Sequence, residues 1–129
     1  MTFLNLMYVA FGGAAGSMAR YGVSSLIGHY DHTSFPFGTF AVNIIGSLLM
    51  GALLASIALL VPAKGKDLHL ILAVGFLGGF TTFSAFSFDT YMLFERGLWL
   101  ELSLYVAGSV GLSVLAFFAG MWLTKAAIG

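Results

Sequence analysis

The chain has 129 residues, of which 60% are hydrophobic and 8% are charged, and its formal net charge is zero. Five basic and five acidic residues are too few to cover a soluble domain of this size, so the composition indicates a membrane protein. The basic residues are scattered, which excludes the cationic face that nucleic-acid binding needs, and the absence of cysteine excludes disulfides and thiolate metal sites.

Segments long enough to cross a bilayer need roughly 20 apolar residues in a helix. The sequence predicts an all-α membrane protein, a single four-helix transmembrane domain over residues 1–129, with spans at about 3–28, 37–61, 69–94 and 98–124. The short connections between them contain turn-forming or charged residues: HYDHTSFP (29–36), VPAKGKD (61–67) and ERG (95–97). No basic stretch precedes the first apolar run, so we expect that span to be retained rather than cleaved as a signal.

Lys and Arg in short loops orient a membrane protein, and here they give little direction. With a cytoplasmic N-terminus, three basic residues would lie inside and two toward the outside: Lys64, Lys66 and Lys125 against Arg20 and Arg96. Insertion in both orientations, or dual topology, is therefore an open hypothesis.

The first span carries Gly12, Gly16 and Arg20 at i, i+4 spacing, on one helical face. Gly12 and Gly16 form a GxxxG packing face. An arginine near bilayer depth is costly unless it snorkels to the interface or reaches water. Both interpretations of Arg20 are open: snorkelling, or a place in an aqueous vestibule where its charge would concentrate anions.

The second span places Thr39, Asn43, Ser47 and Gly51 on one face at the same spacing. Such a polar and small stripe serves either close helix packing or a polar path.

The third span contains GFLGGFTTFSAFSFD (75–89), in which Gly78, Gly79, Thr81 and Thr82 would weaken a helix. Non-helical backbone at membrane depth survives only when it is buried in protein or faces a cavity. Carbonyls freed by a break are hard oxygen ligands that suit an alkali cation. The alternative is a packing kink relieved by side-chain hydroxyls.

Phe80, Phe83 and Phe86 recur at i, i+3 just after this point. A phenyl ring has a positive edge, so rings presented edge-on can attract an anion in a dry pore, although such a stripe also suits the core or the lipid. An adjacent row carries hydroxyls: Thr81, Ser84 and Ser87.

The fourth span has Tyr105, Ser109 and Ser113 at i, i+4, a second hydroxyl stripe. Serine in a membrane helix commonly bonds its own i−4 carbonyl, so this stripe is open to a packing interpretation too. Two stripes together favour a polar path.

Four pieces of the sequence resemble, in order, the Fluc or CrcB family of small fluoride channels: GGAAGSMARY (12–21), GTFAVNIIGSLLMG (38–51), GFLGGFTTFSAFS (75–87) and YVAGSVGLS (105–113). They cover essentially the whole chain, and the GG and TTFS spacing is the most specific part. The resemblance implies an antiparallel, dual-topology homodimer of four-span subunits with a broken third helix. It also implies two pores per dimer that pass fluoride passively across the cell inner or plasma membrane, protecting against fluoride toxicity.

The same resemblance implies roles for individual residues. Phe83 and Phe86 correspond to the phenylalanines whose ring edges contact fluoride, and Asn43 to the amide donor of the pore. The expected polar lining is Ser84, Ser109 and Ser113, with Tyr105 a further candidate.

Outside the pore, Arg20 corresponds to the vestibule arginine. The backbone carbonyls of Gly78 and Thr81 correspond to ligands of a central structural sodium ion (Na⁺) shared by the two subunits. Ala85 departs from the family pattern, which often has threonine there, and this removes one hydroxyl beside the phenylalanines.

Two other readings fit a small four-span protein. An exporter of hydrophobic cations would need a membrane-embedded carboxylate, which the first span lacks, although Asp89 lies toward the end of the third. An accessory subunit would use the polar stripes for packing alone. We do not expect an enzyme, because no nucleophile, base and orienting group are grouped together.

Overall fold

The structure is a computed structural model, and it describes residues 1–28 and 35–129. Every element in these residues is helical: α1 (Phe3–Gly28), α2 (Phe37–Leu60), η1 (Pro62–Lys64), α3 (Gly65–Leu68), η2 (His69–Leu77), α4 (Gly78–Phe80), α5 (Phe83–Glu95) and α6 (Trp99–Ile128). The prediction of an all-helical protein is therefore confirmed for the described residues. Most of the expected first connection, residues 29–34, lies outside them.

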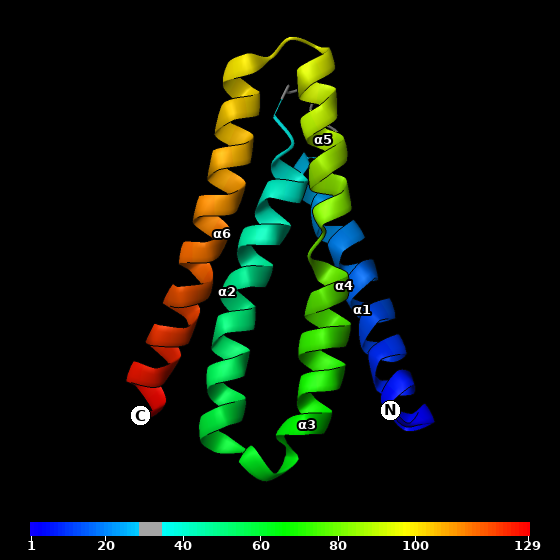
Figure 1. Cartoon of the computed structure of the whole chain (residues 1–129), viewed down its shortest axis with the longest axis vertical. Coiled ribbons are helices and arrows are strands. Elements are labelled where there is room, and N and C mark those ends of the chain that lie inside the picture. The colour runs from blue at the N-terminus through cyan, green and yellow to red at the C-terminus, as the bar shows by residue number, and fades with distance from the viewer. Residues whose placement is uncertain (29–34) are drawn as a thin grey trace.

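The helices form four columns in Figure 1, with η2, α4 and α5 following one another in the third column. Both termini and α3 lie at one end of the molecule, and the α5–α6 turn lies at the other. Among the described residues, three stretches are long and apolar enough to cross a membrane: Phe37–Leu60, Pro62–Glu95 and Trp99–Ile128. Helix α1 has 26 residues but is not among them, because glycines, polar residues and Arg20 lower its hydropathy. Its membrane crossing stays a prediction.

The turn between α5 and α6 is closed by a glycine cap. Gly97 has φ +67°, a left-handed conformation that glycine adopts without a Cβ penalty. The Gly97 N–H donates to the Phe94 carbonyl at 2.9 Å and the Leu98 N–H to the Leu93 carbonyl at 3.0 Å. This is the Schellman pattern, which satisfies the last carbonyls of α5 and returns the chain antiparallel as α6.

Glycines bring two pairs of helices into backbone contact. A Cβ at Gly12 or Gly16 of α1 would collide with backbone carbonyls of η2, those of Ile71 and Phe76. Helices α2 and α6 contact each other in the same way at Gly51 and Gly120. The GxxxG face predicted on the first span is thus a packing face, as small residues at membrane helix contacts commonly are.

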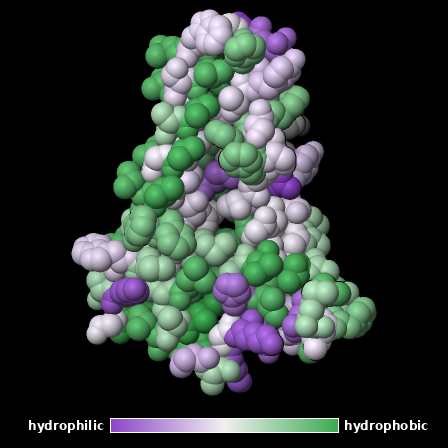
Figure 2. All heavy atoms as spheres, viewed as in Figure 1, coloured by the Kyte–Doolittle hydropathy of each residue, from purple (hydrophilic) through white to green (hydrophobic). Residues whose placement is uncertain are grey.

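A small aromatic cluster lies between α5 and α6. Its buried members are Phe86, Leu93 and Tyr105, and partly buried apolar residues pack around them: Phe35, Phe40, Leu98, Leu102 and Val106. Most other large apolar side chains are exposed, and hydrophobic surface covers much of the face in Figure 2. Such a surface is expected where lipid or another subunit replaces water.

Candidate functional site

The third column is not a continuous helix. Helix α4 ends at Phe80, Thr81 has φ −83° and ψ 157°, Thr82 has φ −152° and ψ 124°, and α5 starts at Phe83. The Thr82 hydroxyl caps α5 by accepting from the Ala85 N–H at 3.2 Å. Nine residues of π-helix, His69–Leu77, lead into this two-residue interruption. Threonine both disfavours the helix and supplies a new N-cap, so the sequence is locally suited to stop and restart here.

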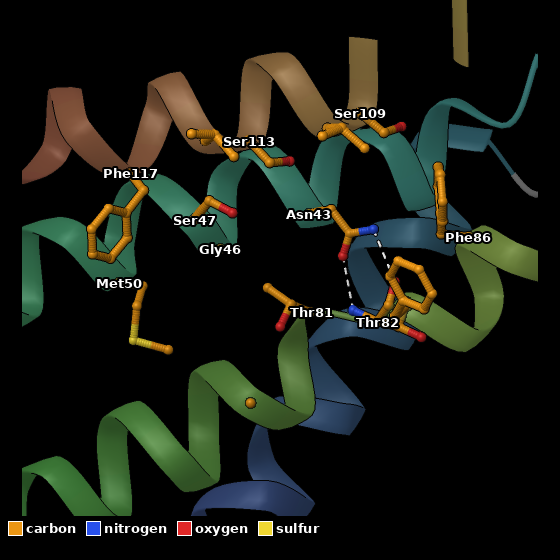
Figure 3. Close-up of a pocket in the computed structure, with 14 residues that line it drawn as sticks. Asn43, Gly46, Ser47, Met50, Thr81, Thr82, Phe86, Ser109, Ser113 and Phe117 are labelled. Atoms are coloured by element: carbon orange, nitrogen blue, oxygen red, sulfur yellow. Dashed lines mark hydrogen bonds between the residues drawn. The ribbon is translucent and has the colours of Figure 1, made fainter. Parts of the chain in front are cut away.

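Asn43 of α2 pairs with the backbone of the interruption. Its Nδ2 donates to the Thr82 carbonyl at 2.9 Å, and its Oδ1 accepts from the Thr82 N–H at 2.8 Å (Figure 3). The side-chain amide thus acts as a neighbouring strand would, satisfying both backbone groups of Thr82 without water. One of the two Nδ2 hydrogens is left for another acceptor.

Arg20 of α1 contacts the same region from the opposite side. Its Nε donates to the Gly79 carbonyl at 3.1 Å. Gly79 itself lies close to α1, because a Cβ added there would come within 2.6 Å of the Gly13 carbonyl oxygen. At least one N–H donor of Arg20 is therefore bonded to backbone rather than to solvent.

The Thr81 carbonyl, in the interruption, accepts no hydrogen bond from any described residue. The Thr81 N–H and hydroxyl both donate to the Leu77 carbonyl, each at 3.0 Å. A break in a helix is expected to leave carbonyls without a backbone donor in this way. Thr81 is one of the two predicted sodium ligands, and the other, Gly78, lies three residues before it at the start of α4.

A cavity of about 460 Å³ lies beside the interruption, between α2, α5 and α6. Its walls include most of the predicted pore residues: Asn43, Phe83, Phe86, Ser109 and Ser113. Gly78 and Thr81 border it as well. Other lining residues lie outside the predicted set of pore and sodium-binding residues: Gly46, Ser47, Met50, Thr82, Val110, Val114 and Phe117. Figure 3 shows the serines of α6 and Asn43 of α2 along one side of this space.

The two serines of α6 do not form the hydrogen bonds that serines in helices usually form. Ser109 is only 5% exposed, and the buried hydroxyls of Ser109 and Ser113 have no partner. By contrast, Ser103 on the same helix donates to its own i−4 carbonyl, that of Trp99, at 2.8 Å. Because an unpaired buried hydroxyl costs about 1–3 kcal/mol, these two groups are available to a ligand in the cavity.

The two predicted pore phenylalanines are neighbours but differ in burial. Their ring centroids are 5.4 Å apart with the ring planes at 44°. Phe86 is 9% exposed and packs against Tyr105, whereas Phe83 is 77% exposed in the single chain. Phe83 therefore has room for a contact that the chain does not itself provide.

Two predicted pore residues do not line the cavity. Ser84 is exposed and contacts the Thr82 hydroxyl at 3.2 Å. Tyr105 is fully buried, and its hydroxyl donates to Asp89 Oδ2 at 3.0 Å. Their roles as pore residues stay predictions.

A second cavity, of about 420 Å³, also borders Thr82. Arg20 and Asp89 both line it, and Thr82 borders both cavities. The sequence gave Asp89 no role, because an acidic residue near a span end carries no sign of which helix supplies its donor. Met50 and Phe117 were also missed, although Phe117 continues the i, i+4 row of Ser109 and Ser113.

The family model described as "CrcB-like protein, Camphor Resistance (CrcB)" matches residues 7–121. The chain is 52% identical over 120 residues to the "Fluoride-specific ion channel FluC" of Paracoccus denitrificans, covering 93% of this chain and 91% of the relative. It is 46% identical over 123 residues to the protein of the same name from Rhizobium johnstonii, covering 95% of this chain and 98% of that one. A third relative of that name, from Chelativorans sp., is 45% identical over 121 residues, covering 94% and 96%.

Proposed function

Because the chain belongs to the CrcB-like protein family, we propose that it is a channel selective for fluoride, which passes the ion passively across the inner or plasma membrane and protects against fluoride toxicity. Membership confirms the resemblance seen in the sequence. It also confirms the expectation that the chain is not an enzyme, since the relatives are named as ion channels.

The observation that carries this proposal is the pair of unpartnered hydroxyls on α6. Fluoride is strongly hydrated, so a narrow pore has to replace the hydrogen-bond donors of water. Ser109 and Ser113 offer two free hydroxyls, and Asn43 retains one amide hydrogen at the same cavity. Ring edges of Phe83 and Phe86 would add weak positive contacts. Several weak sites let an ion enter and leave.

The working assembly in this proposal is an antiparallel homodimer with two pores, each built from both chains. The exposed Phe83 and the apolar exterior support a partner at this face, because an apolar surface beside a polar cavity must be covered by protein or lipid. The nearly even distribution of Lys and Arg supports dual topology.

A broken third helix and a structural sodium ion at the subunit contact complete the proposal. The extended backbone at Thr81 and Thr82 supports the break. The chain fits the ion, because the Thr81 carbonyl is an oxygen acceptor without a donor among the described residues and Gly78 borders the same cavity. No cluster of His, Cys, Asp or Glu competes within the described residues. When bound, sodium would neutralise the dipoles of carbonyls that the interruption leaves without a hydrogen-bond donor.

Flux from liposomes tests the function directly. Protein is reconstituted into vesicles loaded with fluoride, and efflux is followed with a fluoride electrode in the absence of a proton gradient. We expect rapid emptying, no dependence on an opposing proton gradient, and little chloride leak from matched vesicles. Slow efflux that requires a proton gradient would instead indicate a coupled transporter, and a chloride leak as fast as fluoride efflux would refute selectivity.

A further inference from the structure

Arg20 stands in register with the glycines that pack α1 against the third column. Gly12, Gly16 and Arg20 follow one another at i, i+4, and both glycines touch backbone carbonyls of η2. One turn beyond Gly16, the side chain of Arg20 reaches the Gly79 carbonyl at 3.1 Å, in the short helix α4 just before the interruption. The same face of α1 thus contacts backbone first through glycine and then through guanidinium.

The Gly79 carbonyl needs this partner because of the interruption. In an unbroken helix it would accept from the Phe83 N–H, four residues on. Thr81 and Thr82 are instead extended, and Phe83 is the first residue of α5, so the helical geometry that places this donor over Gly79 is lost. A carbonyl without a donor is costly at membrane depth, and the Arg20 Nε–H supplies the donor that the helix has lost.

The interruption is consequently held from two helices. Asn43 of α2 pairs with both backbone groups of Thr82, and Arg20 of α1 holds Gly79. These two contacts lie on either side of Thr81, whose carbonyl is unpaired. Because each contact is directional, together they fix how the peptide planes between Gly79 and Thr82 are turned.

We propose that Arg20 is a positioning residue, whose Nε–H sets the geometry of the interrupted backbone, and that this hydrogen bond rather than its charge is what the protein requires at position 20. An arginine that served only to draw anions toward a vestibule would leave its donors facing solvent. Here the Nε–H is directed at a backbone oxygen in a partly buried site. The flux and sodium measurements below rest on the proposed function, whereas the unfolding temperatures do not.

Two substitutions separate the hydrogen bond from the charge. Glutamine carries an amide N–H the same number of bonds from Cα as the arginine Nε, so Arg20→Gln keeps the donor and removes the charge. Arg20→Met has similar length and removes both. Arg96→Met is the matched control, because Arg96 is an exposed arginine in the α5–α6 turn whose side chain forms no hydrogen bond within the described residues.

The test measures thermal unfolding of purified full-length protein in detergent, with sodium present and with sodium replaced by N-methylglucamine, followed by fluoride efflux from liposomes. We expect Arg20→Gln to unfold within about 1 °C of the parent and Arg20→Met about 4 °C lower, as the loss of one satisfied buried carbonyl would give. We also expect the stabilisation by sodium to survive in Arg20→Gln and to shrink in Arg20→Met. Efflux should fall about tenfold in Arg20→Met and less than about twofold in Arg20→Gln and Arg96→Met.

Two results would overturn the inference. One is an Arg20→Gln protein that unfolds and conducts like Arg20→Met, since the donor would then be irrelevant and the charge essential. The other is an Arg20→Met protein as stable as Arg96→Met. If Arg20→Met gives no folded protein, the comparison of Arg20→Gln with the parent still decides. A parent protein that does not conduct fluoride would refute the proposed channel while the order of unfolding temperatures continued to test Arg20.

Discussion

The side-chain amide of Asn43 and the backbone of Thr82 form two hydrogen bonds, of 2.9 and 2.8 Å, across 39 positions of sequence. Asn43 therefore does more than line a cavity. It occupies the place of a missing strand or helix turn, and it couples the shape of the third column to the position of α2. A change at Asn43 should disturb stability as well as conduction.

Asn43→Asp tests this double role. Aspartate cannot donate, so the Thr82 carbonyl loses its partner, and the new charge faces the unpaired carbonyls nearby. We expect fluoride efflux to be abolished and stability to fall by about 1–3 kcal/mol. Efflux and thermal unfolding measure the two effects. Ser56→Ala is the control, because the Ser56 hydroxyl bonds its own helix at Ala52. Unchanged unfolding in Asn43→Asp would contradict the pairing with Thr82.

Ser109→Ala and Ser113→Ala should separate conduction from stability. Both hydroxyls are buried without a partner, so their removal should leave stability unchanged or raise it slightly. Loss of donors from the cavity should lower fluoride efflux by about tenfold for each substitution. Ser103→Ala, which removes an exposed hydroxyl bonded to Trp99, serves as the control for efflux. Parent-like efflux in both cavity variants would remove these serines from the ion path.

Phe83→Ile and Phe86→Ile should behave differently although the two rings are adjacent. Phe86 is buried against Tyr105, so shortening it should cost about 1–3 kcal/mol by the cavity left behind. Phe83 is largely exposed in the single chain, so its replacement should not destabilise the fold itself. We expect both to lose fluoride efflux. Equal destabilisation by the two substitutions, measured by thermal unfolding, would contradict the difference in burial.

Tyr105→Phe tests the contact between α5 and α6. The substitution removes the donor to Asp89 Oδ2 while keeping the ring in its aromatic cluster. We expect a loss of about 1–3 kcal/mol in stability, because a carboxylate at a partly buried site would be left without that donor. Asp89→Asn retains an acceptor oxygen and should cost less. If Tyr105 contributes to the fold through its ring alone, Tyr105→Phe will lose no more stability than Asp89→Asn in thermal unfolding.

Removal of sodium should weaken the folded protein. A ligand that binds only the folded state stabilises it by about 2.7 kcal/mol at 100 times its dissociation constant. Replacing sodium with N-methylglucamine, which is too large for a pair of carbonyls, should therefore lower the unfolding temperature and the fluoride efflux together. Choline, an equally unsuitable cation, should give the same result as N-methylglucamine. No change in either measurement would argue against the sodium site.

The helical pattern of this chain could be predicted because hydropathy and turn residues are local signals. The long helices begin close to the predicted residues, as at Phe3, Phe37 and Trp99. The π-helix at His69–Leu77 was not predicted, since its composition is that of any apolar helix. An apolar composition of this kind does not distinguish an α-helix from the wider π-helix.

The contacts at the interruption could not be predicted from the sequence, for another reason. Arg20 and Gly79 are 59 positions apart, and a pattern along one helix cannot say which groups of another helix it will face. Periodicity identified the stripe containing Asn43 and the row of Ser109 and Ser113, because a face of a helix can be read from spacing. It placed Tyr105 in the same row as the serines, but the aromatic cluster and Asp89 draw that side chain away from the cavity.

The glycine contacts between α2 and α6 fix how closely these two helices approach. A side chain at Gly51 or Gly120 would push α2 and α6 apart, so these glycines set the distance between the helix that carries Asn43 and the helix that carries the two serines. The spacing between these donors is therefore built in during folding. An ion that entered the cavity would meet donors whose separation the packing of the two helices has already set.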